Sequence, residues 1–315
     1  MGKELDLRHQ QTNYRSPFTR WDESSWIRSK TIRKDSISGG LPFSPELVPL
    51  ASHEVISQNS TYFLTVLAYQ LLTHLQYTTK LEIGYINPAC GDLVQGNIPV
   101  SLTQEQRNDA LRICCDESAH ALFVEILSTQ VEETFGLDRF QVEPPKFART
   151  IDEIIEQNKT RISPNLIRLF FVIIAETLLT KIFTYLPDDK QVAPIVRNFI
   201  GNHAADEALH RVYFRSLFPL VWNNLSIAEQ EEVGQILPQL LWGVLQPDIA
   251  NESKILSILG LNTETSKAIL EDIYQPKKVV ESARKSAKPC LKIFEEAGVL
   301  FISSIRQSFA EHQLL

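Results

Sequence analysis

The sequence predicts an all-α protein, and three observations support this fold class. Apolar residues recur at intervals of three and four over long stretches, the spacing of one face of a helix. Helix-start signals precede two such stretches, in the capping boxes at residues 103–106 and 226–229. The sequence contains no convincing alternating run typical of a strand and no Gly-rich phosphate loop. The clearest helical series consists of Phe63, Val66, Leu67, Leu71 and Leu75.

The composition is that of a globular protein. With 315 residues, of which 43% are apolar and 22% charged, the chain can bury a substantial core in one large domain or two ordinary ones. The net charge is −7, and although the first 40 residues are basic, they contain no dense Lys/Arg run with interleaved aromatics. We therefore expect no nucleic-acid partner. The solidly apolar run 169–175 is far shorter than the ~20 residues that span a bilayer, so we expect no membrane partner.

The cysteines and the N-terminus predict the cellular compartment. The four cysteines show neither C-x-x-C spacing nor the density of a disulfide framework. The first residues contain no apolar stretch of the kind found in secretory signals. We therefore expect a reducing, cytoplasmic location.

The chain is expected to consist of an extended N-terminal arm (1–50) and a single helical domain (51–315). The arm is rich in Ser, Arg and Pro and shows little periodicity, so it is expected to run over the surface. The first helix is expected from about residue 57 to 86, where Pro88 and Gly91 close it. A loop over residues 91–101 would then lead to the second helix.

Three more long helices follow, each with a recognisable boundary. Gly136 ends the second helix of the domain. Ser163 and Pro164 supply an N-cap and a first-turn proline for the third. Pro194 begins the fourth, and Pro219 is expected to end it. The expected ranges are about 104–135, 164–185 and 194–219.

The sequence pattern of the C-terminal third predicts additional helices beyond these four. The capping box at Ser226 begins a helix that is expected to be kinked or broken at Pro238. Shorter helical patterns follow, and their expected ranges are about 250–259, 264–274, 279–288 and 290–312.

The fourth helix of the domain contains a possible metal-binding face. His203, Glu207 and His210 occupy positions i, i+4 and i+7, which lie on one side of a helix. An Asp precedes this Glu, and the same D-E-x-x-H pattern recurs as Glu117 and His120 on the second helix. Either motif alone could be a solvated helix face. Two copies on long, otherwise apolar helices indicate a site for two metal ions.

Two isolated glutamates complete the expected carboxylate set. Four-helix carboxylate sites take a Glu-x-x-His from each of two helices and a single Glu from each of the others. Glu82 interrupts the first helix, and Glu176 interrupts a strongly apolar run where an unpaired charge would be costly to bury. Each precedes its motif at a similar interval, 35 residues from Glu82 to Glu117 and 31 from Glu176 to Glu207.

The donor set also indicates which metals are expected. Four carboxylates balance two divalent ions, and oxygen-rich ligands with a few imidazoles fit iron, with manganese as the other candidate. Asp116 and Asp206 are candidates to accept hydrogen bonds from the histidine rings across the site, although both could equally be surface residues.

With these motifs, the chain resembles the p-aminobenzoate N-oxygenase family of ferritin-like di-iron enzymes. The resemblance rests on the 35-residue interval, on the segment L-E-I-G-Y-I-N-P-A, and on His203, which stands four residues before the second motif's Glu. It covers roughly residues 60–215. It implies a ferritin-like four-helix bundle with additional C-terminal helices. It also implies seven metal ligands: Glu82, Glu117, His120, Glu176, His203, Glu207 and His210.

The family resemblance implies a di-iron oxygenase that activates O₂ and oxidises an amine to a hydroxylamine, nitroso or nitro product in specialised metabolism. An external electron donor and a homodimer are expected. Family members that oxidise aminobenzoates carry an Arg five residues before the first ligand Glu, where this chain has Tyr77. Tyr77 could simply be a packing residue, but the exchange argues against p-aminobenzoate itself. The expected substrate is therefore an amine that is either a small molecule or an amino acid bound to a carrier protein.

Other functions remain open on the sequence. A di-iron C–H hydroxylase or desaturase would use the same cluster. A ribonucleotide reductase radical subunit is disfavoured because His203 is unnecessary there. A non-enzymatic ferritin-like iron-binding protein would usually be a bundle of only ~150–180 residues.

Overall fold

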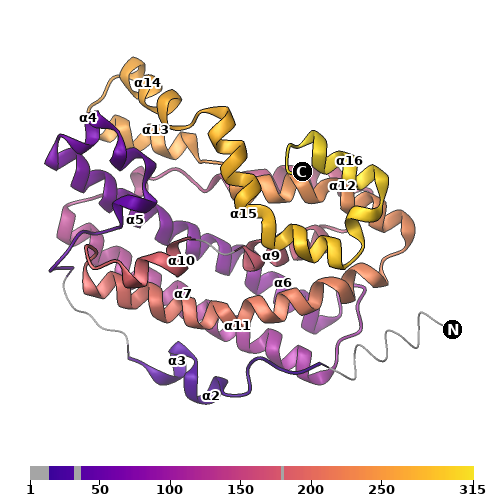
Figure 1. Cartoon of the computed structure of the whole chain (residues 1–315). Coiled ribbons are helices and arrows are strands. Elements are labelled where there is room, and N and C mark those ends of the chain that lie inside the picture. Colours follow the sequence, from indigo (N-terminus) through magenta and orange to yellow (C-terminus); the bar gives the residue numbers. More distant parts are fainter. Residues whose placement is uncertain (1–13, 32–36, 179–180) are drawn as a thin grey trace.

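The computed structural model describes residues 14–31, 37–178 and 181–315, and this part of the chain is all-α (Figure 1). In the described part, the β-type pairing is confined to a bridge between Leu41 and Val192. The expected fold class is confirmed. Within the described residues, no helix combines the length and apolarity that a bilayer crossing requires. The central bundle consists of α5 (Ser60–Leu81) and its continuation α6 (Asn87–Gln95), α7 (Gln104–Phe135), α9 (Pro164–Thr177) and α11 (Pro194–Asn224).

The segment before the bundle is more structured than expected. Phe18, Ser25 and Trp26 are buried instead of lying on the surface. Helices of four residues are too short to show a periodicity, which is why the sequence pattern did not reveal them. Residues 1–13 and 32–36 lie outside the described part, and the domain boundary at residue 50 stays a prediction. The short elements are α2 (Trp21–Ser24), α3 (Trp26–Ser29), η1 (Pro45–Leu47), η2 (Pro49–Ser52) and α4 (Glu54–Ser57).

The expected end of the first helix was wrong. The chain passes from α5 through a π-helical turn, η3 (Glu82–Ile86), directly into α6, so Pro88 and Gly91 lie within a helix. A proline in the first turn of a helix loses no hydrogen bond, and Pro88 stands in the first turn of α6. Helix α6 ends at Gly96, whose φ of 77° suits a glycine cap.

Three prolines that were expected to end, kink or separate helices lie inside continuous helices. Pro219 is within α11, Pro238 within α12 and Pro289 within α15. An internal proline costs about 3 kcal/mol, but each of these stretches buries several large side chains, worth roughly 1.5–3 kcal/mol each. After Pro219, for example, Val221 and Trp222 are at most 2% exposed. Packing therefore outweighs the proline penalty. The bounds are α12 (Ile227–Leu245) and α15 (Pro276–Glu296).

Other boundaries agree in part with expectation. Both capping boxes form, at Thr103 and at Ser226. The helix expected to reach residue 185 ends at Thr177, and Ser163 makes no side-chain cap bond. Helix α8 (Lys146–Asn158) was not anticipated. The remaining elements are η4 (Arg139–Gln141), α10 (Lys181–Tyr185), η5 (Leu186–Asp188), α13 (Ile249–Ile258), α14 (Thr263–Ile273), η6 (Val299–Phe301) and α16 (Ser303–Glu311).

Candidate metal centre

The structure brings all seven residues expected at the metal site into one buried cluster inside the bundle. They come from η3, α7, α9 and α11, and their exposed fractions range from 0% to 8%. Carboxylates and imidazoles are rarely buried together without a compensating partner. The cluster consists of Glu82, Glu117, His120, Glu176, His203, Glu207 and His210.

The cluster divides into two overlapping groups, each with ligand atoms within 4.8 Å of one another. Group A contains Glu82, Glu117, His120, His203 and Glu207. Group B contains Glu117, Glu176, Glu207 and His210. Glu117 and Glu207 belong to both. The two oxygens of Glu117 face different histidines: Oε2 lies 3.4 Å from Nδ1 of His120, and Oε1 lies 2.9 Å from Nδ1 of His210. Such a carboxylate is placed to connect two ions.

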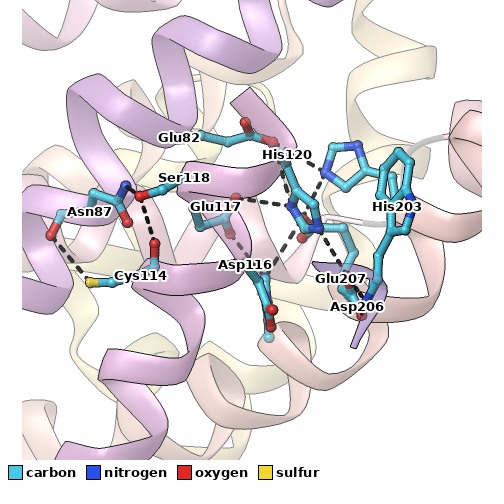
Figure 2. A network of polar contacts seen from close by, with 12 residues as sticks. Glu82, Asn87, Cys114, Asp116, Glu117, Ser118, His120, His203, Asp206 and Glu207 are labelled. Atoms are coloured by element: carbon cyan, nitrogen blue, oxygen red, sulfur yellow. Dashed lines mark hydrogen bonds and ion pairs between the residues drawn. The ribbon is translucent and has the colours of Figure 1, made fainter. Parts of the chain in front are cut away.

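Two aspartates orient two of the imidazoles from outside the cluster. Nε2 of His120 lies 3.0 Å from Oδ2 of Asp206 (Figure 2). Nε2 of His210 lies 3.3 Å from Oδ2 of Asp116. Because an ionised carboxylate only accepts hydrogen bonds, each Nε2 carries the proton and donates it. When the ring is neutral, as it must be to bind a metal, each Nδ1 then presents its lone pair to the cluster. The expectation that these aspartates pair with histidines across the site is confirmed.

His203 is held differently. Its Nε2 faces the cluster, 2.9 Å from Oε1 of Glu207 and 3.2 Å from Oε1 of Glu82. Its Nδ1 is buried and has no hydrogen-bond partner among the described residues. The ring packs at 4.2 Å from that of His120 and edge-on to Phe183 at 4.9 Å, measured between ring centroids. On the side of Nδ1, where His120 and His210 each have an aspartate at their outer nitrogen, aromatic packing therefore holds this third imidazole.

The backbone places the two isolated glutamates at helix irregularities. Glu82 is the first residue of the π-helical turn η3, and Glu176 lies in the last turn of α9, which ends at Thr177. A π-helical turn is rare and occurs frequently at functional sites. Because it accommodates an extra residue, it changes the directions of the side chains that follow relative to a regular helix.

The unpartnered atoms of the cluster suit a cation. Both oxygens of Glu82 and Glu117, one oxygen of Glu176, and Nδ1 of His120 and His210 are buried without a hydrogen-bond partner in the described part. These atoms carry lone pairs and face one another across the cluster, and such a buried set is costly unless a proton or a metal ion lies among them. Oxygen-rich ligands with a few imidazoles fit iron or manganese.

The family comparison agrees with this geometry. The family model for p-aminobenzoate N-oxygenase AurF matches residues 26–298, a span that includes every residue of the cluster. The chain belongs to the p-aminobenzoate N-oxygenase family. This confirms the resemblance seen in the motifs. A search of curated proteins gave no match.

In this family member, the electrostatics of the metal-free cluster favour bound protons. Burial raises the pKa of Glu82 and of Glu176 well above 4.5. Burial lowers the pKa of His120, but Asp206 and Glu117 outweigh it and raise the value to about 9. Burial opposes ionisation of Glu207, yet His210 and His203 hold its pKa well below 4.5. Protons thus partly neutralise the carboxylates that a metal would otherwise neutralise.

The stability of the metal-free protein is expected to fall as the pH rises from 6.5 to about 9. His120 binds its proton more tightly in the folded state, because its pKa rises from 6.5 to about 9. The folded state then holds more protons in this window, so the free energy of unfolding decreases with pH. At about 1.4 kcal/mol per pKa unit, His120 alone contributes on the order of 3 kcal/mol. Urea unfolding of metal-free protein across this range measures the loss.

Metal-loaded protein is the control for this pH dependence, because a coordinated imidazole binds no proton at its ligating nitrogen. The free energy of unfolding of the metal-loaded protein is expected not to decline between pH 6.5 and about 9. Metal-free protein that became more stable over the same range would contradict the protonation of the cluster.

Tyr77 stands where aminobenzoate-oxidising relatives are expected to have an Arg. Its side chain is bound to another residue of this chain and not aimed at a substrate. Its hydroxyl donates to Asp248, the N-cap of α13, and its ring lies edge-on to Phe147 at 6.0 Å between centroids. Burial and the Asp248 hydrogen bond raise the pKa of Tyr77 well above 10. The residue at this position is therefore a neutral structural contact and offers no charge to a substrate carboxylate.

Sequence reasoning missed a set of residues in the N-terminal segment. Trp21 and Ser25 donate hydrogen bonds to Asp116, and Trp26 donates through its backbone to Asp206. The available signal was the stretch W-D-E-S-S-W, which places two of the chain's four tryptophans in an otherwise polar segment. Tryptophan is seldom left on a surface without a function or a packing partner.

Proposed function

We propose that this protein is a non-haem di-iron oxygenase that uses O₂ to oxidise the nitrogen of an amine. Its ligands would be the seven residues of the cluster, with Glu117 and Glu207 shared by the two ions. The observation that carries the proposal is the pair of overlapping ligand groups in a chain of the p-aminobenzoate N-oxygenase family. When bound, a pair of iron ions supplies the redox chemistry that activates O₂.

The first oxidation would convert R–NH₂, O₂, two electrons and two protons into R–NHOH and water. The proposal includes an external electron donor, which would supply these electrons. Further rounds of oxidation would give nitroso or nitro products. The protein's own residues would position the ions: Asp116 and Asp206 fix the tautomers of two histidines, and the apolar residues around Glu176 exclude water.

We propose an amine other than p-aminobenzoate as the substrate, with an amino acid bound to a carrier protein as one candidate. The position of Tyr77 supports this, because its hydroxyl is bound to Asp248. An Arg there could pair with an aryl carboxylate through two parallel hydrogen bonds. A phenol engaged elsewhere cannot replace that charge.

The test is iron loading followed by reduction, exposure to O₂ and analysis of products from a panel of amines. The panel should contain p-aminobenzoate, free amino acids and amino acids loaded on a carrier protein. We expect about two irons per chain, because the ligands are preformed in the fold, and N-oxidised product from a substrate other than p-aminobenzoate. Clearly fewer irons in well-loaded protein, or a large cage in place of the expected homodimer, would contradict the oxygenase.

Replacing His203 by Ala is expected to weaken one of the two iron sites and leave the other intact. His203 belongs to group A and not to group B. Iron titration should therefore show one tight site and one weakened site. Asn198→Ala is a matched control, because Asn198 is exposed on the same helix. Loss of both irons in His203→Ala, or of neither, would contradict the assignment of this residue to a single ion.

A further inference from the structure

One segment outside the bundle reaches both histidine–aspartate pairs of the metal centre. We call residues 14–31 the N-terminal strap. It crosses the outer side of α7 and α11, where its helices α2 and α3 lie (Figure 1). Its two ends are attached: the hydroxyl of Tyr14 donates to Asp109 at 2.6 Å, and Nζ of Lys30 donates to Asn202 at 2.5 Å. The strap is thus fixed to one helix at its start and to the other at its end.

The first contact is with Asp116, the partner of His210. Nε1 of Trp21 lies 2.8 Å from Oδ2 and 2.9 Å from Oδ1 of Asp116, and Oγ of Ser25 donates to Oδ1 at 2.7 Å. Ser25 is 0% exposed and Asp116 is 1% exposed. The ring of Phe18 also packs against that of His210, with centroids 6.0 Å apart. Among the described residues, the strap therefore supplies two of the three donors that hold this carboxylate, the third being His210.

The second contact is with Asp206, the partner of His120. The backbone N–H of Trp26 lies 3.2 Å from Oδ2 and 3.3 Å from Oδ1 of Asp206. The indole ring of Trp26 packs 6.0 Å from the ring of His120. One strap thus contacts the carboxylate and the imidazole of both pairs, although the pairs belong to different ligand groups.

We propose that the N-terminal strap is part of the metal centre, with Trp21 and Ser25 as positioning residues that orient His210 through Asp116. This inference rests on the proposed metal centre. A carboxylate held by two donors from the strap has one orientation, and so it fixes both the tautomer and the ring direction of the histidine it accepts from. Without them, Asp116 can rotate, and His210 loses the fixed direction of its Nδ1 lone pair. Removing a hydrogen-bond partner that orients a metal ligand typically lowers metal affinity about 10- to 100-fold.

The strap's donors to Asp116 are expected to affect only one of the two ions. His210 belongs to group B, whereas group A contains His120 and His203. Removing the two strap donors to Asp116 should therefore weaken group B and leave group A unchanged. If the strap only covered the bundle, removing these donors would not weaken group B more than group A.

The experiment compares a Trp21→Phe, Ser25→Ala double variant with wild type. Phenylalanine keeps an aromatic ring beside Arg28 but removes the indole N–H. Metal-free protein is titrated with Fe²⁺ without oxygen, then challenged with a chromogenic iron chelator, and Mössbauer spectra are recorded on the loaded forms. We expect the affinity of one iron to fall about 10- to 100-fold, with a changed spectrum for that iron alone.

Three further variants separate positioning from folding. Ser24→Ala removes an exposed hydroxyl of the same strap that bonds to Arg20 O, and it should bind iron like wild type. Ser25→Thr keeps the hydroxyl and should restore affinity relative to Ser25→Ala. If the double variant does not fold, Ser25→Ala alone carries the test, and thermal unfolding of each metal-free variant reports on folding.

The outcomes distinguish this inference from the proposed function. Wild-type protein that bound no iron would overturn the metal centre and the strap's role with it. Wild-type protein with two irons and a folded double variant with unchanged affinities and spectrum would overturn the strap's role alone. Equal weakening of both irons would also overturn it, because the selectivity for group B would be absent.

Discussion

A Glu117→Ala variant is expected to lose both metal ions, whereas a Glu82→Ala variant should keep the ion of group B. Glu117 is a member of both ligand groups, and its two oxygens face His120 and His210 separately. Glu82 belongs to group A alone. Removing a shared carboxylate takes one ligand and one negative charge from each ion, so both affinities should collapse. Metal analysis after anaerobic iron loading measures the ratio of iron to protein.

The control for this pair is Glu133→Ala, which removes an exposed carboxylate from the same helix as Glu117. It should bind iron as wild type does. If Glu117→Ala retained one tightly bound iron, Glu117 would not be shared, and the two groups would have to be independent sites.

A Glu176→Leu variant is expected to be more stable than wild type without metal and to gain less stability from iron. Glu176 is 7% exposed at the end of the apolar helix α9, and one of its oxygens has no hydrogen-bond partner in the described part. Burial raises its pKa well above 4.5, with Glu207 and Glu117 adding to the effect. Replacing an uncompensated buried carboxyl by an apolar side chain of similar size is expected to stabilise the metal-free protein by about 1–4 kcal/mol.

Urea unfolding with and without Fe²⁺ in the absence of oxygen tests this expectation. Wild type should gain stability on loading, because a ligand that binds only the folded state stabilises it. Glu153→Leu, at an exposed position of α8, controls for the general effect of adding a leucine. A Glu176→Leu protein that was less stable than metal-free wild type would show that the carboxyl has a structural partner in place of a metal.

The sequence was sufficient for the fold class and for which residues gather at the site. Helical spacing is local, so His203, Glu207 and His210 had to share one face of whatever helix contained them. The duplicated motif and Glu176 in its apolar run then indicated the other helices. These inferences needed no knowledge of how the chain packs.

The helix boundaries near prolines were decided by packing. Pro88 and Pro219 carry the local signal for a helix end, and that signal was wrong at both positions. At Pro88 the π-helical turn lets a new helix begin. At Pro219 the burial of Val221 and Trp222 outweighs the local penalty. Local propensity is worth a few kcal/mol at most, and burial of several side chains exceeds it.

The sequence by itself determined the cluster of carboxylates and imidazoles, because each of its motifs lies within one helix. Only the tertiary structure decided that Glu117 faces two histidines, that Tyr77 is bound to Asp248, and that the N-terminal strap holds Asp116 and Asp206. Apart from the contact between Glu117 and His120 within one helix, these contacts join residues about 90 to 180 positions apart, and no local periodicity relates such residues. Hydrogen bonds at that separation form only after the helices have packed, so their partners are set by the fold.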